Sequence, residues 1–194
     1  AKYSINLSND YFIYPANIPI LGWLFSIFDD YRNVKFYFTP QNFSFNLTAK
    51  RNRTFSQNRT LGSSPSVQRD FTANRSMQFN WKLSEGGFLN PSVNYSLDIA
   101  SSLAYLLTGE NERERNSSAI FGDIFEGEFF GRDNNYRQTV DFKLNPSLPT
   151  LWDINRYFTL TANYNVNYNW RFNFQQDSLG RSSQFTNNIR AGLT

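Results

Sequence analysis

Two acidic segments offer side chains that could do chemistry. The segment GENERERN, residues 109–116, carries Glu110, Glu112 and Glu114, and paired carboxylates can act as a general acid and a general base. These glutamates alternate with arginines, so we expect a solvated loop with internal ion pairs rather than a catalytic pair. The segment GDIFEGEFFGRD, residues 122–133, carries further carboxylates that could bind calcium, but it lacks the spacing of an EF-hand loop.

Two residue types common in catalytic and metal sites are absent from the chain. It has no cysteine and no histidine, which excludes disulfides, zinc-finger spacing and histidine-based catalysis. It also has no glycine-rich phosphate loop and no nucleophile elbow. We therefore expect no catalytic residue, no cofactor and no metal site, and a protein that is not an enzyme.

The most regular pattern in the chain is FTLTANYNVNYNWRFNF, residues 158–174. Every second residue is apolar or aromatic, and the residues between them are Thr, Asn or Arg. Because side chains alternate faces along a strand, this period of two predicts an extended chain between two different environments. Soluble strands usually have about 3–10 residues, whereas a tilted strand needs about 9–11 to cross the hydrocarbon of a bilayer. The length of the pattern favours a membrane barrel over a soluble sandwich.

Composition agrees with strands that have one face in lipid and one in water. Aromatic residues make up 18% of the chain, with 20 Phe and 11 Tyr, yet the mean hydropathy is −0.55. This combination is typical of outer-membrane barrels. The charge is balanced, with 19 basic and 16 acidic residues, so no nucleic-acid partner is expected despite a pI of about 9.2.

Seven segments show this alternation and predict seven strands. They are 2–9, 41–51, 71–83, 92–101, 136–145, 156–174 and 184–194. The predicted fold is all-β: a transmembrane antiparallel β-barrel segment, about seven strands of a much larger barrel, with one short amphipathic helix. Residues 1–194 then form a single segment, and we interpret the chain as an internal excerpt of a longer polypeptide, because seven strands cannot close a bacterial barrel.

The connections between these segments alternate in length. Residues 84–91 and 146–155 are short and rich in turn residues, and they fall on one side of the predicted sheet, with the helix-containing connection 10–40. Residues 52–70 and 102–135 are predicted as long loops on the opposite side, together with 175–183. Short turns are periplasmic and long loops extracellular in bacterial barrels, which predicts the orientation.

The segment IPILGWLFSIFDDY, residues 18–31, departs from the period of two. Leu21, Leu24, Phe25 and Phe28 follow at the spacing of one helical face. At about fourteen residues the helix is too short to span a bilayer. We expect it either to pack on the barrel rim or lumen, or to form an amphipathic interface with the membrane or with a partner protein.

The alternation assigns two sets of residues to opposite faces. The polar set, predicted to line a pore, is Asn163, Asn165, Asn167, Asn169, Asn94, Ser96, Asn80 and Asn46. The apolar set, predicted to face lipid, is Tyr164, Val166, Tyr168, Trp170, Phe79, Trp81, Phe45 and Leu97. Asparagine and threonine hydrogen-bond to water without presenting strong fixed charge.

Three stretches resemble one known family. They are GRDNNYRQTVDFKLNPSLPTLWDINRYFTLTANYNVNYNW, FYFTPQNFSFNLTAKRNRTFSQ and FTANRSMQFNWKLSEGG. From about Tyr37 to its C-terminus the chain is similar to the SprA/Sov family, giant outer-membrane translocons of the type 9 secretion system and gliding motility machinery of Bacteroidota. The resemblance implies a very large single-chain barrel that exports folded cargo. It also implies a plug protein, an outer-membrane shuttle protein at a lateral opening, and surrounding lipid as partners.

Two other functions fit the same pattern. The chain could be a slice of a porin or of a TonB-dependent transporter for small solutes. It could also be a soluble β-rich adhesin or glycan-binding module. Solubility without detergent would favour the adhesin or glycan-binding module, and the strand number of the intact protein separates the two kinds of barrel.

Overall fold

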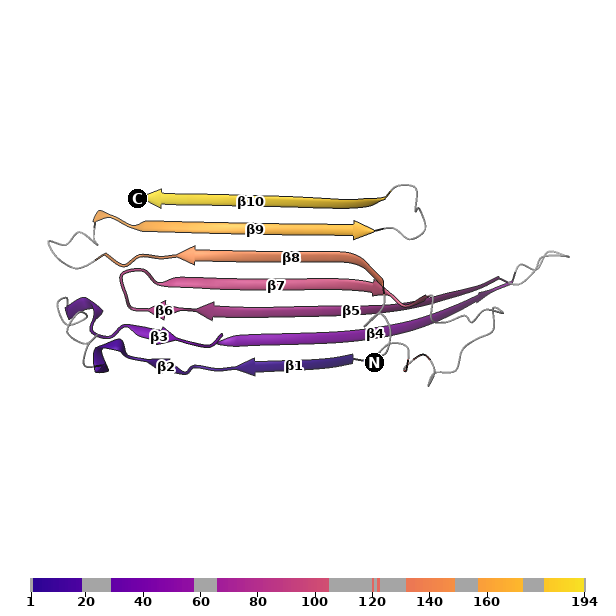
Figure 1. The fold of residues 1–194 in the computed structure, drawn as a ribbon, viewed down its shortest axis with the longest axis horizontal. Helices are drawn as coiled ribbons and strands as arrows, with labels where there is room; N and C mark the ends of the chain where they lie inside the picture. The colour runs from indigo at the N-terminus through magenta and orange to yellow at the C-terminus, as the bar shows by residue number, and fades with distance from the viewer. Residues whose placement is uncertain are drawn as a thin grey trace.

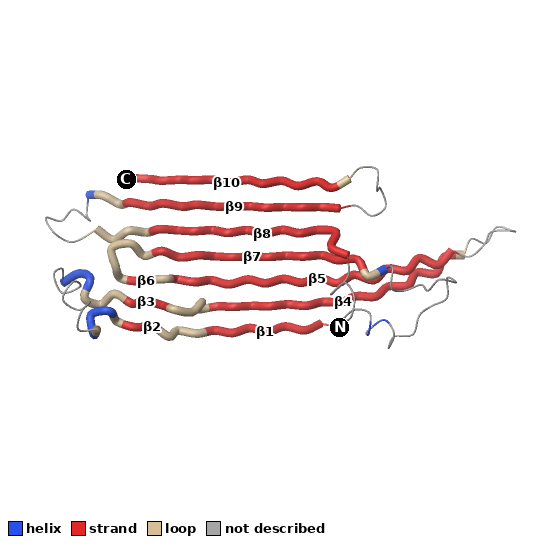
Figure 2. The backbone as a smooth tube through the Cα atoms, in the orientation of Figure 1, coloured by secondary structure: helices blue, strands red, loops and turns tan. Residues whose placement is uncertain are grey.

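The protein folds as a long antiparallel sheet with a smaller sheet at one end (Figures 1 and 2). The computed structural model describes residues 2–18, 29–57, 66–104, 120, 122, 132–148, 157–172 and 180–193. The large sheet has seven strands in the order β1-β4-β5-β7-β8-β9-β10. Their bounds are Lys2–Ser8 for β1, Asn42–Ser56 for β4, Ser66–Lys82 for β5, Pro91–Ser102 for β7, Arg132–Leu144 for β8, Leu160–Phe172 for β9 and Arg181–Leu193 for β10.

These seven strands are the seven that the alternation predicts, so the all-β fold and the antiparallel order are confirmed. Each strand pairs with the next long strand along the chain. The registers run without a shift except at Ala100/Ser101, where β7 meets an irregularity against β8. Because an unshifted antiparallel register keeps opposite residues on the same face, the alternation of each strand continues across the whole sheet.

Two of the predicted loops are shorter than expected. The prediction of a loop over 52–70 is wrong at both ends, since β4 continues to Ser56 and β5 begins at Ser66. Arginines at Arg51, Arg53 and Arg69 interrupt the hydrophobic alternation there, but backbone pairing persists across fifteen residue pairs. The prediction of a loop over 102–135 is likewise wrong at its ends, because β7 includes Ser102 and β8 begins at Arg132.

The connection over 10–40 contains strands that the sequence does not predict. β2 (Phe12–Ile13) and β3 (Lys35–Tyr37) pair with each other, and β3 pairs with β6 (Ser84–Glu85). Two single-turn 3-10 helices, Pro15–Asn17 and Asp29–Tyr31, belong to the same region. The predicted helical face of Leu21, Leu24, Phe25 and Phe28 lies outside the described residues.

The smaller sheet, the two 3-10 helices and residues 32–34 are here called the rim, and side-chain hydrogen bonds fasten it to the neighbouring turns. The hydroxyl of Tyr31 donates to the carbonyl of Ser147 at 2.8 Å. The amide of Asn90 donates to the carbonyl of Asn145 at 3.1 Å and accepts from the backbone of Gly87 at 2.8 Å. Gly86 adopts a φ of +75°, which favours glycine, at the start of this turn. The rim is therefore an ordered border at the end that holds the short connections.

The described part of the chain has little buried core. Its buried hydrophobic residues are Val34, Tyr37, Ala73, Leu103 and Ile120. Val34 and Tyr37 belong to the rim, and the other three form one cluster with Phe71 at the opposite end of the sheet. Most side chains on both faces of the seven strands are partly or fully exposed, so the sheet is a single layer over most of its described area.

Candidate functional site

The polar face of the seven-stranded sheet is organised in straight rows of side chains. One row crosses all seven strands and contains Ser8, Asn42, Asn80, Asn94, Asp141, Asn165 and Asn188. The next row contains Asn6, Ser44, Gln78, Ser96, Thr139, Asn167 and Thr186. A third row begins with Ser4 and Asn46 and ends with Asn169 and Gln184. Short neutral amides and hydroxyls therefore predominate across the middle of this face.

Hydrogen bonds join these polar side chains to one another. Asn80 donates to Asn94, and Asn165 donates to the carboxylate of Asp141. Asn167 donates to Asn165 at 2.6 Å and accepts from Thr139 at 2.9 Å. Donors and acceptors that are already paired compete less well for a passing molecule, because any new bond must replace an existing one.

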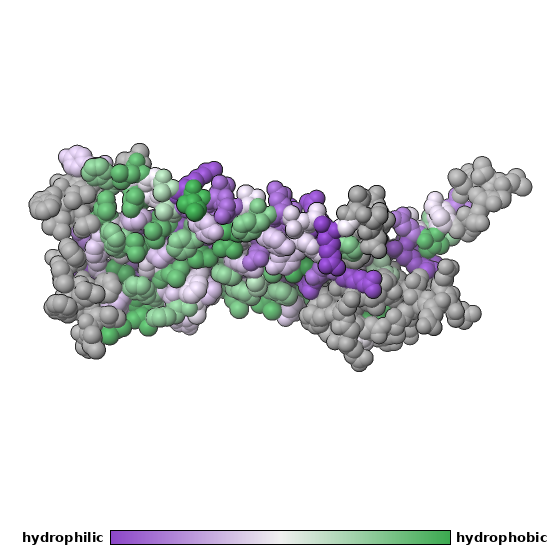
Figure 3. Space-filling view, turned by 45° about the horizontal axis from the view of Figure 1, so that its top comes forward, coloured by the Kyte–Doolittle hydropathy of each residue, from purple (hydrophilic) through white to green (hydrophobic). Residues whose placement is uncertain are grey.

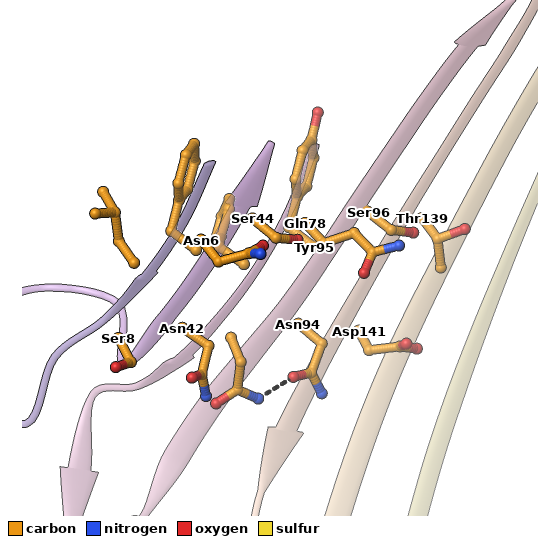
Figure 4. A pocket seen from close by; sticks show the side chains of 14 residues that line it. Asn6, Ser8, Asn42, Ser44, Gln78, Asn94, Tyr95, Ser96, Thr139 and Asp141 are labelled. Carbon is orange, nitrogen blue, oxygen red and sulfur yellow. Dashed lines mark hydrogen bonds between the residues drawn. The ribbon is translucent and has the colours of Figure 1, made fainter. Parts of the chain in front are cut away.

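The two central rows line a hollow of about 580 Å³ in the polar face. Figure 4 shows Asn6, Ser44, Gln78, Ser96 and Thr139 side by side across five strands. Below them lie members of the first row, Ser8, Asn42, Asn94 and Asp141. The hollow is also lined by Leu7, Phe43, Phe79 and Tyr95, which lie between the two rows in sequence, and it contains one carboxylate, from Asp141. Its side chains can donate and accept hydrogen bonds, but they include no nucleophile paired with a base.

The apolar face follows the same register and is largely uncovered in the described residues. One of its rows contains Leu7, Phe43, Phe79, Tyr95, Val140, Val166 and Asn187. On the outermost strand, Ile189 is 77% exposed and Phe185 is 63% exposed. In the view of Figure 3, hydrophobic residues (green) extend over the left and centre, and hydrophilic residues (purple) gather toward the right-hand end. Uncovered apolar surface of this extent marks an interface with lipid or protein.

Aromatic side chains gather at the end of the apolar face that lies away from the rim. The rings of Tyr136 and Tyr168 meet edge to face, with centroids 5.8 Å apart. The guanidinium of Arg181 lies 6.0 Å from the ring of Trp170 and 5.4 Å from that of Phe172. Such amphipathic rings beside a cation are typical of the border between an apolar environment and water.

One charged cluster lies on the apolar face, and the sequence pattern does not predict it. Arg75 occupies the same row as Leu47 and Ile99. Its guanidinium donates to the hydroxyl of Ser101 at 2.8 Å and forms an ion pair with Asp133. Ser101 is fully buried and donates to the same carboxylate at 2.7 Å, so three strands contribute to one polar cluster. Asp133 reaches Arg75 because of the irregularity between β7 and β8, which sequence alternation cannot reveal.

By strand parity and register, the polar set and the apolar set of eight residues each lie on opposite sides of the sheet; that one side lines a pore and the other faces lipid stays a prediction. The polar set and the apolar set do not mix in any row. The predicted pore-lining set leaves out several members of the hollow, among them Ser8, Asn42, Ser44 and Asp141, although the alternation places them on the same face. Polar residues also lie in the apolar rows, among them Gln138, Ser183 and Asn187, and they weaken the contrast on β8 and β10.

Neither a metal cluster nor a membrane-spanning helix is found among the described residues. No group of three or more acidic side chains in these ranges could hold a metal ion. In the same part of the chain, no helix has the length and apolar character needed to cross a membrane. Comparison of the chain with protein-family models, with curated proteins and with solved structures gives no match.

Proposed function

We propose that this chain forms part of the wall of an outer-membrane β-barrel that exports folded proteins, a translocon of the type 9 secretion kind. In this proposal the apolar face contacts lipid and the polar face lines a water-filled pore. The protein makes and breaks no covalent bond; it provides a path. The proposal extends the family resemblance of the sequence and rests on the two faces of the sheet.

The observation that carries the proposal is the uncovered apolar face. Rows of Phe, Tyr, Leu, Val and Ile cross seven strands, and in the described part of the chain a second layer covers them only near Ala73. Leaving such a surface in water costs about 25 cal/mol for each Å² of apolar area. A bilayer removes this cost without any further protein layer.

The height of the apolar face matches a bilayer. From Leu160 to Trp170, β9 advances ten residues, or about 33 Å at about 3.3 Å per residue. A tilt of about 40° reduces this to about 25 Å along the membrane normal, which is the usual height of the apolar band on outer-membrane barrels. The aromatic cluster around Trp170 then lies at one border of the hydrocarbon.

The polar face has the properties needed for a pore wall. Two of its central rows line a hollow, and these rows are mostly neutral amides and hydroxyls, several of them bonded to each other. A wall of this kind is wet, and its paired amides bind cargo less readily than unpaired ones would. Strands of the same protein beyond β1 and β10 would close the barrel, because an open sheet edge is unstable in lipid.

The partners in this proposal follow from the same family. They are secreted cargo proteins in the pore, a plug protein that closes it, and a shuttle protein that collects cargo at a lateral opening in the outer membrane. A porin or a TonB-dependent transporter for small solutes would share both faces of the sheet. Passage of folded proteins in a secretion assay with the intact protein distinguishes the translocon from these alternatives.

Cysteine labelling of β9 in intact outer membranes tests the proposal. Single cysteines at Asn163, Asn165 and Asn167 should react with a water-soluble maleimide. Cysteines at the matched neighbours Ala162, Val166 and Tyr164 should be shielded by lipid. Equal labelling of the two sets contradicts a membrane wall and favours a soluble adhesin or glycan-binding module.

A further inference from the structure

The polar face carries more positive than negative charge, and its charges are not evenly distributed. On the seven strands, its cations are Lys2, Lys50, Lys82, Arg132, Arg137, Lys143, Arg171 and Arg190. Its carboxylates are Asp70, Asp98 and Asp141. The difference is five positive charges over the same described strands.

The cations frame the central amide rows on both sides. At the end next to the rim, one row reads Lys82, Ser92, Lys143, Asn163 and Arg190, with a cation on every second strand. At the other end, Lys2 and Arg171 belong to a single row that contains no carboxylate on the described strands. Asp98 and Asp141 lie between these rows, and Asp98 faces Arg137 directly across β7 and β8.

The row beside the rim is spaced so that the fields of its cations overlap. Neighbouring strands lie about 4.8 Å apart, so cations on every second strand are about 10 Å apart. This is close to the Debye length of about 8–10 Å at ionic strengths of 0.1–0.15 M. A mobile anion near the row therefore feels more than one cation at a time.

Neighbouring acids reduce this field without cancelling it. Glu85 of the rim lies 4.0 Å from the amine of Lys82, and both side chains are about half exposed. Asp141, one row deeper, accepts a hydrogen bond from Asn165. Lys143 and Arg190 remain beside neutral Ser92 and Asn163, and Arg190 lines a second hollow of about 290 Å³ with Asn163, Asn165 and Asn188.

We infer that the polar face is an electropositive wall that favours anions and the acidic surfaces of cargo proteins. This inference rests on the proposed function, since it requires the polar face to line a pore. Rings of Lys or Arg select anions in pores, and a low-dielectric wall of one sign raises the local concentration of the opposite charge. The cargo class it names is a folded protein with an acidic surface.

The test is ion selectivity of the intact protein in planar lipid bilayers, measured as the reversal potential in a KCl gradient. The wild type should pass chloride in preference to potassium, and more weakly near 1 M salt, where the Debye length is about 3 Å. A triple variant, Lys82→Gln, Lys143→Gln and Arg190→Gln, should lower the chloride-to-potassium permeability ratio by about twofold or more.

A matched variant removes the same charge from the opposite face. Arg51→Gln, Arg53→Gln and Arg69→Gln lie on the apolar side of β4 and β5, so this variant should leave the ratio near the wild-type value. A cation-selective pore, or equal effects of the two variants, overturns the electropositive wall and leaves the proposed pore intact. No water-filled conductance at all overturns the proposed function itself, and the inference with it.

Discussion

The two faces of the large sheet share one backbone but differ in how their polar side chains are hydrogen-bonded and how deeply these bonds are buried. On the polar face, Asn80 donates to Asn94 in a partly buried hydrogen bond, and Asn167 donates to Asn165 in an exposed one. On the apolar face, the charged group of Arg75 is held by Ser101 and Asp133, and the hydroxyl of Ser101 is fully buried. Water can replace a lost bond on the polar face, whereas nothing equivalent is at hand on the other. The consequence of a substitution should therefore depend on the face more than on the residue type.

The largest difference is expected for an introduced charge on β9. Val166→Arg places a guanidinium among the apolar rows, at an expected cost of about 2–4 kcal/mol if this row lies near the bilayer midplane. Asn165→Arg, one residue away, turns toward water and should cost little. The folded fraction of each variant in purified outer membranes measures the difference. Equal assembly of the two variants would contradict the assignment of the faces.

A smaller difference between the two faces is expected when an existing charge is removed from each. Arg75→Gln breaks the ion pair with Asp133 and weakens the bond to Ser101, and we expect a loss of about 1–3 kcal/mol in the free energy of unfolding. Arg137→Gln removes a cation from the polar face and should cost less than about 0.5 kcal/mol. Denaturant titration of the two variants in detergent gives both values. If Arg137→Gln is the more harmful change, the contrast between the faces is wrong.

The amide pairs of the polar face should contribute still less to the free energy of unfolding than the ion pair of Arg75 does. Asn80→Ala and Asn94→Ala, combined in a double-mutant cycle, should show a coupling energy of about 0.5 kcal/mol, because water competes for both amides. The same unfolding measurement yields this value. A coupling well above 1 kcal/mol would mean that these rows are structurally rigid rather than easily exchanged with water.

The smallest effect concerns the rim, which belongs to neither face. Desolvation by burial raises the pKa of Tyr37 above 10.0, and its hydrogen bond to Glu85 at 3.0 Å and the charge of Glu85 raise it further. The folded state thus holds this proton more tightly than the unfolded state. The resulting stability is complete below about pH 10 and is lost as the pH rises through the raised pKa. Tyr37→Phe should therefore show a smaller fall in Tm between about pH 8 and about pH 11 than the wild type. An identical fall in Tm for the variant and the wild type would show that Tyr37 does not contribute to the pH dependence of stability.

Much of the sheet could be predicted from local alternation. The period of two around Val166 fixes which side chains share a face, whatever the partner strand is. Strand ends were less predictable where polar and apolar residues no longer alternate. At Arg53 and Arg69 the hydrophobic alternation stops, yet the strands continue, because backbone hydrogen bonds between β4 and β5 do not depend on side-chain type.

The sequence by itself determined the strands and the separation of asparagine from aromatic residues, since both follow from neighbours along the chain. Only the tertiary structure decided which residues lie in one row. Register is set by pairing between strands, and a shift of two residues would preserve every face while changing every row. The hollow around Asn94, the meeting of Arg75 with Asp133, and the cation row from Lys82 to Arg190 all depend on that register. They join residues that can be more than a hundred positions apart in the chain, beyond the reach of any local pattern.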